Sequence, residues 1–346
     1  MKVLVVGDIH WSTYSSIVRS RGVHFSTRLE YLIKSLSWVE QISKEYGCEE
    51  EIFLGDTFDK PDLSSEEITA LSEVEWNKSA RLRHFIVGNH ESGVSNLTYN
   101  STQILHKMGV IEDAPYLYSL DEKTEFLFLP YITEDDRKQS IIEYMQGRQS
   151  SKKLIVFSHN DIKNFQMGPF LSKTGFDIDD IERNCDLYIN GHLHNGGWVS
   201  PRKILNLGIL CGQNFSEDAF KYEHHVAVLD TDTLELTFIE NPYALNFYKV
   251  NIEDEKNINQ LAFLKPNAVV SVKCIDSLKD KLLDKLVVYP PLVYKTIYTR
   301  DIESASSSGD VAELNNKDHL EQFKEYILET LGTSDVVQEE LQEVCK

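Results

Sequence analysis

The sequence has no long hydrophobic run and only five cysteines. No window of about 18 residues is both apolar and uncharged, which excludes an ordinary membrane-spanning helix. Met1 is followed at once by the strand-like run Lys2-Val3-Leu4-Val5-Val6-Gly7, so we expect no signal peptide. The cysteines are scattered and lack CxxC or zinc-ligand spacing. These absences favour a reduced, cytoplasmic location with no membrane partner.

Positive charge is also scarce. The chain has 35 basic and 55 acidic residues, a net charge of -20 at pH 7. Residues 301–346 contain twelve acidic and three basic residues, so this segment supplies -9 and the preceding 300 residues only -11. Phosphate-binding proteins usually show a basic face, and bound divalent metals would add positive charge at a site. The acidity therefore counts against a nucleic-acid partner without excluding one.

The order of predicted elements indicates an α/β fold. Short apolar runs alternate with helix-like stretches through residues 1–241, at 2–6, 26–46 (helix), 51–54, 64–80 (helix), 83–87, 99–108 (helix), 125–129, 154–158, 187–190, 204–207 and 226–230. Residues 242–300 contain a second, strand-helix-strand pattern, with strands at 246–252, 268–274 and 293–299 and a helix at 276–284. A chain of 346 residues has room for one large domain and a smaller one.

Residues 301–346 are predicted to be a linker and a helical tail. The segment Glu303–Asp310 is rich in small polar residues, as flexible linkers are. After it, four apolar residues fall at i, i+3, i+7 and i+11 on an otherwise acidic helix, namely Leu320, Phe323, Ile327 and Leu331. This stripe either packs on its own chain or binds a partner, and the sequence leaves both readings open.

Polar clusters follow several of the strand-like runs. They are Gly7-Asp8-Ile9-His10, Gly55-Asp56-Thr57-Phe58-Asp59, Gly88-Asn89-His90-Glu91, Ser158-His159-Asn160 and Gly191-His192-Leu193-His194. Because the carboxyl ends of buried strands meet at one edge of a sheet, we expect these side chains to gather there. We expect the glycines before them to permit tight turns and a close approach of the backbone to phosphate.

The residue types in these clusters are those of a metal site. Carboxylate and amide oxygens combined with imidazoles suit manganese, iron or zinc better than calcium or magnesium, and the lack of cysteine argues against structural zinc. Residues two apart share one side of an extended segment, so Asp8 with His10 and His192 with His194 can face one cleft. A shared carboxylate, for which Asp56 is the candidate, would hold two metals roughly 3.5–4 Å apart.

Together these motifs resemble the calcineurin-like metallophosphoesterase superfamily, whose pattern is DxH, GDxxD, GNH[DE], H and GHxH. The resemblance spans residues 1 to about 240. It implies a four-layer αββα sandwich with two metals. One metal would be bound by Asp8, His10 and His194, the other by Asn89, His159 and His192, and Asp56 would bridge them. His90 would protonate the leaving oxygen or stabilise the pentacoordinate phosphorus, and Asp59 would orient His90.

Within the superfamily, the sequence Gly55-Asp56-Thr57-Phe58-Asp59-Lys60-Pro61 is similar to the GDxFD form of SbcD nucleases and lacks the Arg-Gly continuation of phosphoprotein phosphatases. The run from Asn206 to Asp218 is similar to the SbcD family's NxGSxxxxxFxE stretch, with Ile209 in place of the serine. This resemblance implies Mn2+ as metal and residues 242–300 as a small α+β capping domain that positions DNA. It also implies that the tail helix binds an SbcC-like SMC-type ATPase. The compact, acidic chain looks like a phage-encoded member, which would act in the host cytoplasm.

The same resemblance implies a homodimer, formed through helices at about Ser64–Ala80 and Asn100–Lys107 with Leu97, Ile104 and Leu105 as first candidates. For DNA contact the sequence offers small basic clusters, which are Arg19 and Arg21, Lys60, Arg81 and Arg83, Lys152 and Lys153, and Arg202 and Lys203. Arg19 and Arg21 are preferred, since their loop follows the first motif.

Three functions are compatible with these residues. The first is a DNA exonuclease and endonuclease, the nuclease subunit of an SbcCD-like complex in DNA repair, recombination or replication. The second is a phosphodiesterase or phosphatase that acts on a small nucleotide and uses the second domain as a lid. The third, a non-catalytic scaffold, is disfavoured because every expected ligand and the candidate acid His90 are present.

Overall fold

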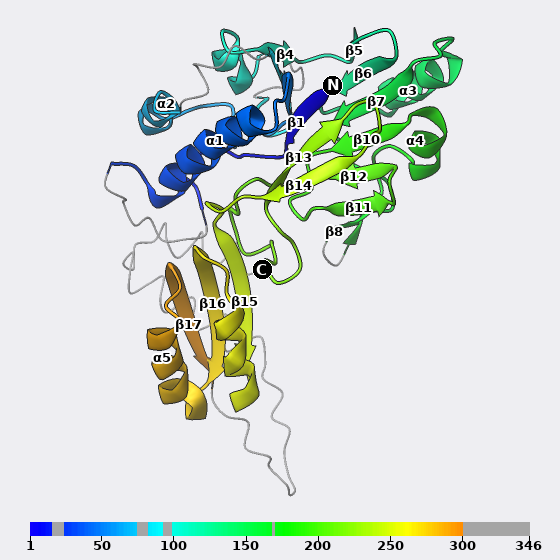
Figure 1. Ribbon diagram of the computed structural model, residues 1–346. Helices are drawn as coiled ribbons and strands as arrows, with labels where there is room; N and C mark the ends of the chain where they lie inside the picture. Colours follow the sequence, from blue (N-terminus) through cyan, green and yellow to red (C-terminus); the bar gives the residue numbers. More distant parts are fainter. Residues whose placement is uncertain (16–23, 75–81, 93–98, 168–169, 300–346) are drawn as a thin grey trace, which may run out of the picture. The chain divides into compact units, whose positions relative to one another are not determined.

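Two six-stranded sheets dominate the first 240 residues of the chain (Figure 1). The computed structural model describes residues 1–15, 24–74, 82–92, 99–167 and 170–299. Among these residues, no helix combines the length and the apolar character needed to cross a membrane.

The first sheet has the order β14-β13-β1-β2-β3-β4. Its strands are β1 (Lys2–Val6), β2 (Glu50–Phe53), β3 (Leu82–Ile86), β4 (Val110–Glu112), β13 (His225–Asp230) and β14 (Leu236–Glu240). Strands β1 to β4 run parallel, whereas β13 pairs with β1 and β14 in antiparallel fashion. Parallel pairing brings the carboxyl ends of β1, β2 and β3 to the same edge.

The second sheet has the order β11-β12-β10-β7-β6-β5. Its strands are β5 (Tyr116–Ser119), β6 (Thr124–Leu129), β7 (Lys153–Ser158), β10 (Leu187–Asn190), β11 (Gly197–Ser200) and β12 (Ile204–Asn206). Strands β6, β7, β10 and β12 are parallel, and β5 and β11 are antiparallel edge strands. A short hairpin, β8 (Gln166–Met167) and β9 (Phe170–Leu171), stands apart.

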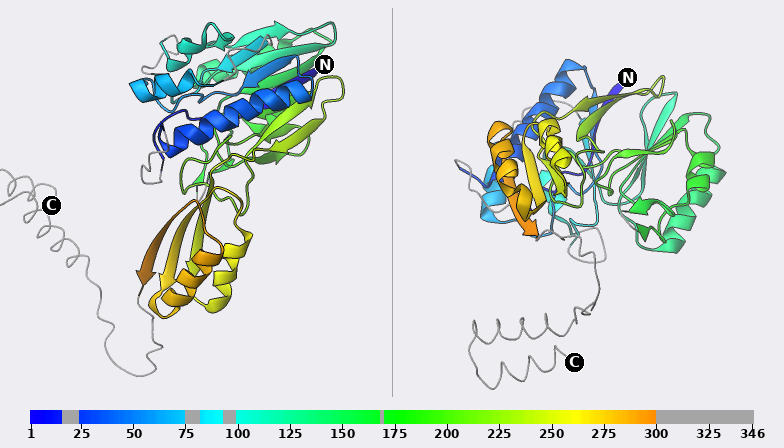
Figure 2. Two further views of the ribbon diagram at one scale, coloured as in Figure 1. Left: turned by 60° about the vertical axis from the view of Figure 1, so that its left-hand side comes forward. Right: turned by 90° about the horizontal axis from the view of Figure 1, so that it is seen from below.

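Alternation along β1 shows how the layers pack. Val3 and Val5 belong to an apolar cluster with Phe126 and Phe157 of the second sheet, so this face of β1 lies between the sheets. Leu4 and Val6 point the other way, into a cluster with α1 (Thr27–Glu45) and α2 (Ser65–Leu71). The far face of the second sheet is covered by α3 (Asp135–Gly147) and α4 (Ile178–Asn184). In Figure 2 the blue α1 and the green α3 and α4 flank the paired sheets. The predicted four-layer αββα arrangement is confirmed.

Residues 246–299 form a separate sheet with its own core. Strands β15 (Asn246–Ile252), β16 (Ala268–Ile275) and β17 (Val293–Thr299) are parallel, in the order β15-β16-β17. The 3-10 helix η3 (Glu255–Phe263), the short turn η4 (Asp276–Leu278) and α5 (Lys279–Val288) supply the connections. Apolar side chains of η3 and α5 pack on one face of the sheet. Helices and strands are both present in this segment, as expected, but its three strands are all parallel, which is an α/β arrangement rather than the expected α+β one. A 3-10 helix stands where the sequence indicated only a polar stretch.

Several predicted elements differ in extent. The helix expected over 99–108 is the 3-10 helix η2 (Ser101–Leu105), and the helix expected over 64–80 is described only as the short α2. The linker and helical tail predicted at 301–346, with Leu320, Phe323, Ile327 and Leu331, lie outside the described residues, as do Leu97, Arg19, Arg21 and Arg81.

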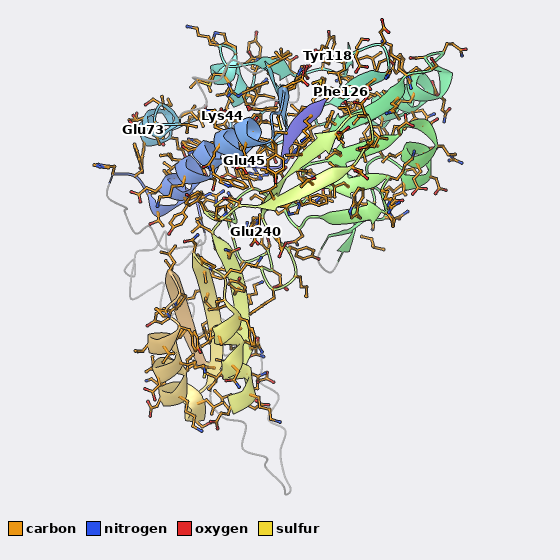
Figure 3. The ribbon with its side chains drawn as sticks, viewed as in Figure 1. Lys44, Glu45, Glu73, Tyr118, Phe126 and Glu240 are labelled. Carbon is orange, nitrogen blue, oxygen red and sulfur yellow. The ribbon has the colours of Figure 1, made fainter. Side chains whose placement is uncertain are left out.

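A cluster of ionisable side chains is buried between the sheets near the start of β3. His84 Nδ1 lies 2.8 Å from Glu112 Oε1, and His84 Nε2 lies 3.5 Å from Glu50 Oε2. Tyr118, labelled near the top of Figure 3, donates a hydrogen bond to Glu50 Oε1 at 3.0 Å. Burial disfavours the charged imidazolium, but the hydrogen bonds and charges of Glu112 and Glu50 outweigh it and raise the pKa of His84. The protonated ring therefore stabilises the folded chain.

This cluster predicts a specific pH dependence of stability. A group whose pKa is raised on folding contributes stability that is complete below its ordinary pKa, here 6.5, and that disappears as pH rises through the raised value. We expect His84→Gln to lower the free energy of unfolding on the order of 1–3 kcal/mol at acidic pH, because it removes hydrogen bonds to charged groups. The difference should shrink steadily above neutral pH. Urea unfolding of the metal-free proteins at several pH values measures it, and a difference that does not change with pH would contradict the assignment.

Candidate metal centre

Loops at the carboxyl ends of both sheets carry the predicted metal ligands. Asp8 and His10 follow β1, Asp56 follows β2 and Asn89 follows β3 of the first sheet. His159 follows β7 and the pair His192 and His194 follows β10 of the second sheet. The sequence indicated one edge of one sheet. The structure instead forms the site from two sheets whose carboxyl ends face the same direction.

Asp8, His10 and His194 form the first group. One ligand atom from each lies within 4.8 Å of the other two. The Nε2 atoms of His10 and His194 are only 3.0 Å apart. Asp8 and His10 are fully buried, whereas the His194 side chain is 22% exposed. Two imidazole nitrogens that face each other at this distance beside a carboxylate can share one cation.

A second group lies beside the first. Asp56, His159 and His192 also offer ligand atoms within 4.8 Å of one another. The Oδ1 atom of Asn89 lies 3.1 Å from His159 Nε2 and 3.0 Å from His192 Nδ1. This arrangement brings the predicted amide ligand next to the two imidazoles of its set.

Asp56 lies between the two groups. Its Oδ2 atom is 3.1 Å from His159 Nε2 in the second group and 3.6 Å from His10 Nε2 in the first. The side chain is 2% exposed. A carboxylate in this position can contact two cations at once, which is the role that the sequence motif led us to expect of it.

Each ligand histidine is held through its second ring nitrogen. His10 Nδ1 contacts Asp59 Oδ1 at 3.0 Å, and His159 Nδ1 contacts the carbonyl oxygen of Leu54 at 2.8 Å. His192 Nε2 contacts Asp161 Oδ1 at 3.0 Å, and His194 Nδ1 contacts Glu217 Oε1 at 3.1 Å. An oxygen behind each imidazole fixes the ring and makes its free nitrogen a better ligand, as at metal sites in general.

Histidines lower the pKa of two carboxyl groups at the site, those of Asp56 and Asp161. Burial disfavours the Asp56 carboxylate, but His159 and His10 outweigh it and hold the pKa of Asp56 below its usual range. The hydrogen bond from His192 lowers the pKa of Asp161. Although burial opposes the charged ring, Asp56 and Asp8 raise the pKa of His159 to about 9. A cation on the His159 ring would take the place of a proton, so its binding should weaken as pH falls.

One buried oxygen tests whether these residues fit metal ions. Asp8 is 0% exposed, and among the described residues its Oδ2 atom has no hydrogen-bond partner. An unpaired buried carboxylate oxygen is costly, and a cation on that oxygen would remove the cost. The donor set of imidazole nitrogens and carboxylate and amide oxygens is that of manganese, iron or zinc rather than of calcium. The residues fit two divalent cations.

The backbone at the ligands adopts unusual conformations. His10, Asp56 and His192 have φ values of 49°, 46° and 75°, in the left-handed region that costs on the order of 1–3 kcal/mol for such residues. A Cβ atom on Gly88 would lie 2.1 Å from Asp56 Oδ1, and one on Gly55 would lie 2.5 Å from His159 Nδ1. The sequence suggested that these glycines let the backbone approach phosphate. Their position shows that they also leave room for the ligand side chains.

His90 and Asp59 are arranged differently from the expectation. His90 Nδ1 lies 3.1 Å from the main-chain oxygen of Asp59 and 3.8 Å from its carboxylate. The Asp59 carboxylate instead contacts His10 and accepts a hydrogen bond from Gln213 Nε2 at 2.8 Å. Asp59 thus holds His90 through its backbone and His10 through its side chain. The His90 side chain is 44% exposed, more than any of the ligand histidines, and its ring packs edge-on against His10.

Sequence reasoning missed three residues that hold the site. Asp161 follows His159 by two residues, so its short spacing was an available signal. Glu217 lies in the 206–218 run but had been given no role. Arg28, near the start of α1, is 1% exposed and donates to the carbonyl oxygens of Gly212 at 2.6 Å, Ile9 at 3.0 Å and His10 at 3.2 Å. No local pattern distinguishes this arginine from a surface residue.

The burial of Arg83 contradicts its predicted contact with DNA, whereas the other predicted contacts stay predictions. Arg83 is buried and pairs with Glu51 and Glu40. Lys152 and Lys153 precede or begin β7, and Arg202 and Lys203 precede β12, so all four lie at the edge opposite the metal ligands. Lys60 remains near the second motif, where its ammonium lies 3.1 Å from Glu67. Arg19, Arg21 and Arg81 lie outside the described residues.

A family model and two solved structures are similar to parts of this chain. The calcineurin-like phosphoesterase family model matches residues 1–196, which include all seven predicted ligands and His90. Curated protein sequences give no match. A dimetal phosphatase from Danio rerio is 14% identical, with 70% of this chain and 99% of that chain covered and a TM-score of 0.43. TT1561 of Thermus thermophilus is 10% identical, with 69% and 98% covered and a TM-score of 0.38.

The contact between Asp161 and His192 predicts a selective loss of metal. Asp161→Asn removes the anion that orients the ring, and we expect the affinity for Mn2+ to fall about 10–100-fold. The matched control is Asp180→Asn, which changes an acid of α4 whose carboxylate pairs with the exposed Arg183. Calorimetric titration of Mn2+ into the metal-free proteins measures the affinity. Equal affinities in wild type and Asp161→Asn would refute a positioning role for Asp161.

Proposed function

The chain belongs to the calcineurin-like phosphoesterase family, and on this basis we propose that it is a two-metal phosphodiesterase that cuts DNA. Membership of the family makes it a hydrolase of phosphoester bonds. The number of metals, their identity as Mn2+ and the DNA substrate are what the proposal adds. The observation that carries the choice of DNA is a lysine-rich face on the three-stranded sheet.

The metal assignment follows the contacts described above. Asp8, His10 and His194 would hold one cation, Asn89, His159 and His192 the other, and Asp56 both. Two bound cations would supply Lewis acidity toward a phosphate oxygen and lower the pKa of a water molecule. The chain supplies the fixed orientation, because every imidazole is anchored from behind.

His90 is the side chain in a position to transfer a proton. A carbonyl oxygen only accepts hydrogen bonds, so His90 Nδ1 donates in its 3.1 Å contact with Asp59. This fixes Nε2 as the atom that exchanges protons with a substrate. In the imidazolium form, Nε2–H can protonate the leaving oxygen. The backbone N–H of His90 donates to Asp56 Oδ1 at 3.0 Å, which fixes the main chain of His90 next to the proposed bridging carboxylate.

The lysine-rich face consists of Lys249, Lys273 and Lys295. Parallel pairing aligns Lys249, Ser271 and Lys295 in one row across the sheet, with Asn251, Lys273 and Ile297 in the next row on the same face. The three lysines are exposed, and η3 and α5 cover the opposite face. No residue within the strands is acidic on this face, and Glu253, just after β15, accepts a hydrogen bond from Asn251 at 2.7 Å. In a chain of net charge -20, such a cationic surface favours a polyanion such as DNA as its ligand.

Further features support an SbcD-type nuclease. The sequence Gly55–Pro61 is similar to that family's second motif, and residues 242–300 are then the capping domain that positions DNA. We infer that the chain is the nuclease subunit of an SbcCD-like complex in DNA repair, recombination or replication. An SbcC-like ATPase would bind Leu320, Phe323, Ile327 and Leu331 of the tail, which lie outside the described residues.

A homodimer also belongs to this proposal, with one correction to its predicted contacts. Leu105 is 0% exposed and is part of the core, so it is not available to a partner. Ile104 is 39% exposed, and Ile68 of α2 is 48% exposed. Among the described residues of the two predicted helices, these two are the large apolar side chains that are exposed. Leu97 lies outside the described residues.

The nuclease proposal predicts Mn2+-dependent release of nucleotides from DNA. We expect the purified chain to degrade labelled linear duplex or single-stranded DNA, and His90→Ala to lower the rate about 10²–10⁴-fold while two metals remain bound. Asp56→Ala should lose both metals and activity. Elemental analysis and gel assays measure these outcomes. If DNA is not cut but a cyclic nucleotide or a dinucleotide is hydrolysed rapidly, the substrate is a small nucleotide and the DNA proposal is contradicted.

The lysine-rich face predicts a change in the salt dependence of DNA binding. Replacing Lys249, Lys273 and Lys295 by glutamine should weaken binding, and the slope of log K against log salt should fall by about 1 for each phosphate that is no longer neutralised. The control replaces Lys279, Lys281 and Lys285 of α5, on the covered side of the same sheet, by glutamine. Fluorescence anisotropy over a range of salt measures both. An equal effect of the two triple variants would refute a specific role for this face.

A further inference from the structure

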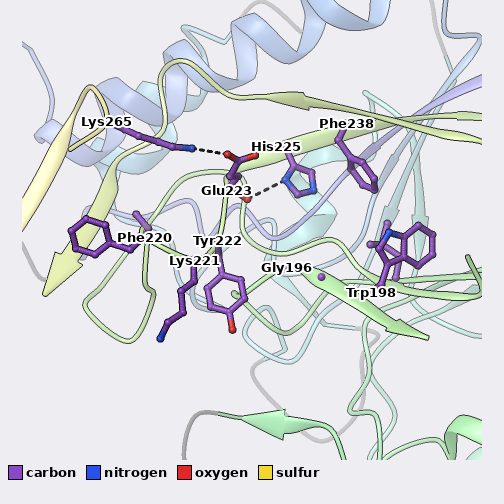
Figure 4. Close-up of a pocket in the computed structure, with 12 residues that line it drawn as sticks. Gly196, Trp198, Phe220, Lys221, Tyr222, Glu223, His225, Phe238 and Lys265 are labelled. Atoms are coloured by element: carbon purple, nitrogen blue, oxygen red, sulfur yellow. Dashed lines mark hydrogen bonds and ion pairs between the residues drawn. The ribbon is translucent and has the colours of Figure 1, made fainter. Parts of the chain in front are cut away.

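An aromatic cleft lies next to the metal centre. Two hollows of about 620 and 390 Å3 share six lining residues, which are Gly196, Gly197, Trp198, Phe220, Lys221 and Tyr222. We call this joint hollow the aromatic cleft. Figure 4 shows the smaller part, with Trp198 and Phe238 on one side and Phe220 on the other. Its size is that of sites that hold small organic ligands.

The larger part of the cleft reaches the residues that hold His194. Asn195, the next residue after His194, lines this part together with Glu217. Glu217 Oε1 is the atom that contacts His194 Nδ1 at 3.1 Å. The Glu217 side chain therefore lies between the cleft and His194 of the first group of metal ligands.

Three aromatic side chains of the cleft are exposed, and two of them, Phe220 and Phe238, pack against a neighbouring ring. Trp198, Phe220 and Phe238 are 40%, 42% and 42% exposed. Phe220 packs edge-on against Tyr248 with ring centroids 4.6 Å apart, and Phe238 packs edge-on against His225 at 4.9 Å. An exposed aromatic ring that is held by a neighbouring ring loses little conformational freedom when a flat ligand stacks on it.

Both cationic and anionic side chains line the cleft, and the anionic ones are Glu217, Asp218 and Glu223. Lys221 and Lys249 line its larger part. Among the described residues, Lys249 has no ion-pair partner, and Lys221 has only an exposed contact with Asp218. Glu217 is buried with His194, and Lys265 in the smaller part is held by Glu223 and Glu240. The ammonium groups that can accept an anion therefore lie beside the aromatic rings, at the end nearest the metal ligands.

From this arrangement we propose that the aromatic cleft binds an unpaired nucleotide next to the phosphate that is cut. Its base stacks on Trp198 or Phe220, and its own phosphate lies near Lys221 and Lys249. Aromatic rings beside cations are how proteins bind single strands without reading their sequence. The inference rests on the proposed function in that it takes a nucleic acid as the substrate. It adds that the strand must be unpaired beside the cleavage point.

Binding to the Mn2+-loaded full-length chain tests the proposal independently of turnover. The probe is a labelled single-stranded oligothymidylate with phosphorothioate linkages that resist hydrolysis, and anisotropy measures its affinity. We expect Trp198→Ala and Phe220→Ala each to weaken binding roughly tenfold. Trp198→Tyr keeps an aromatic face and should restore most of the affinity. Wild-type affinity in both alanine variants would overturn the proposal.

The matched control is Phe263→Ala. Phe263 is 76% exposed at the end of η3 and does not line the cleft, so its loss should leave binding unchanged. An equal loss in this control would contradict a specific site. Unfolding temperatures and bound Mn2+ are compared in all variants, and restoration by Trp198→Tyr distinguishes stacking from misfolding.

A parallel assay separates this inference from the nuclease proposal. If the wild-type chain cuts ordinary DNA but the cleft variants bind the oligonucleotide as tightly as wild type, the nuclease proposal is supported and the proposed binding site in the cleft is refuted. Oligonucleotide binding that depends on Trp198 and Phe220, without release of any nucleotide, would support the cleft and contradict the nuclease.

Discussion

The buried carboxylate of Asp56 is the contact on which the rest of the site depends. It lies between His159 of one sheet and His10 of the other, at 3.1 and 3.6 Å. Keeping it there requires a left-handed backbone at Asp56 and glycines at 55 and 88, since a Cβ atom at either glycine would collide with a ligand side chain. The charge of Asp56 also raises the pKa of His159, against the effect of burial. The two sheets are therefore held together by these polar contacts at the site as well as by their shared apolar core.

Much of this centre could be predicted from the sequence, because each ligand follows an apolar run that ends at a sheet edge. The αββα layers followed from the family resemblance. The anchors behind the ligands could not be predicted in the same way, since Arg28 and Glu217 lie 18 and 23 residues along the chain from His10 and His194. Helix α3 was also missed, because only a few of its residues face the core and its remaining face is polar. The positions of the basic residues were the hardest to predict. The burial of Arg83 depends on tertiary structure, and so does the direction of β7, which places Lys153 away from the metal ligands.

The net negative charge of the chain is compatible with the proposed DNA substrate, because positive charge is concentrated at a few positions. The proposed contacts are local, consisting of three lysines on one face of a small sheet and two cations held by carboxylates and imidazoles. The aromatic cleft lies between these two, with Lys249 common to the cleft and the lysine-rich face. A strand that follows this route would meet cations, then aromatic rings, then the metals. Acidic residues elsewhere would keep other parts of the surface from competing for the same polyanion.

The central claim is that seven side chains from two sheets hold two cations with Asp56 between them. Anomalous diffraction at the manganese edge from crystals grown with Mn2+ tests it most directly. We predict two peaks, one contacting Asp8, His10 and His194 and the other contacting Asn89, His159 and His192, with Asp56 touching both. A single peak, or peaks away from these residues, would contradict the account.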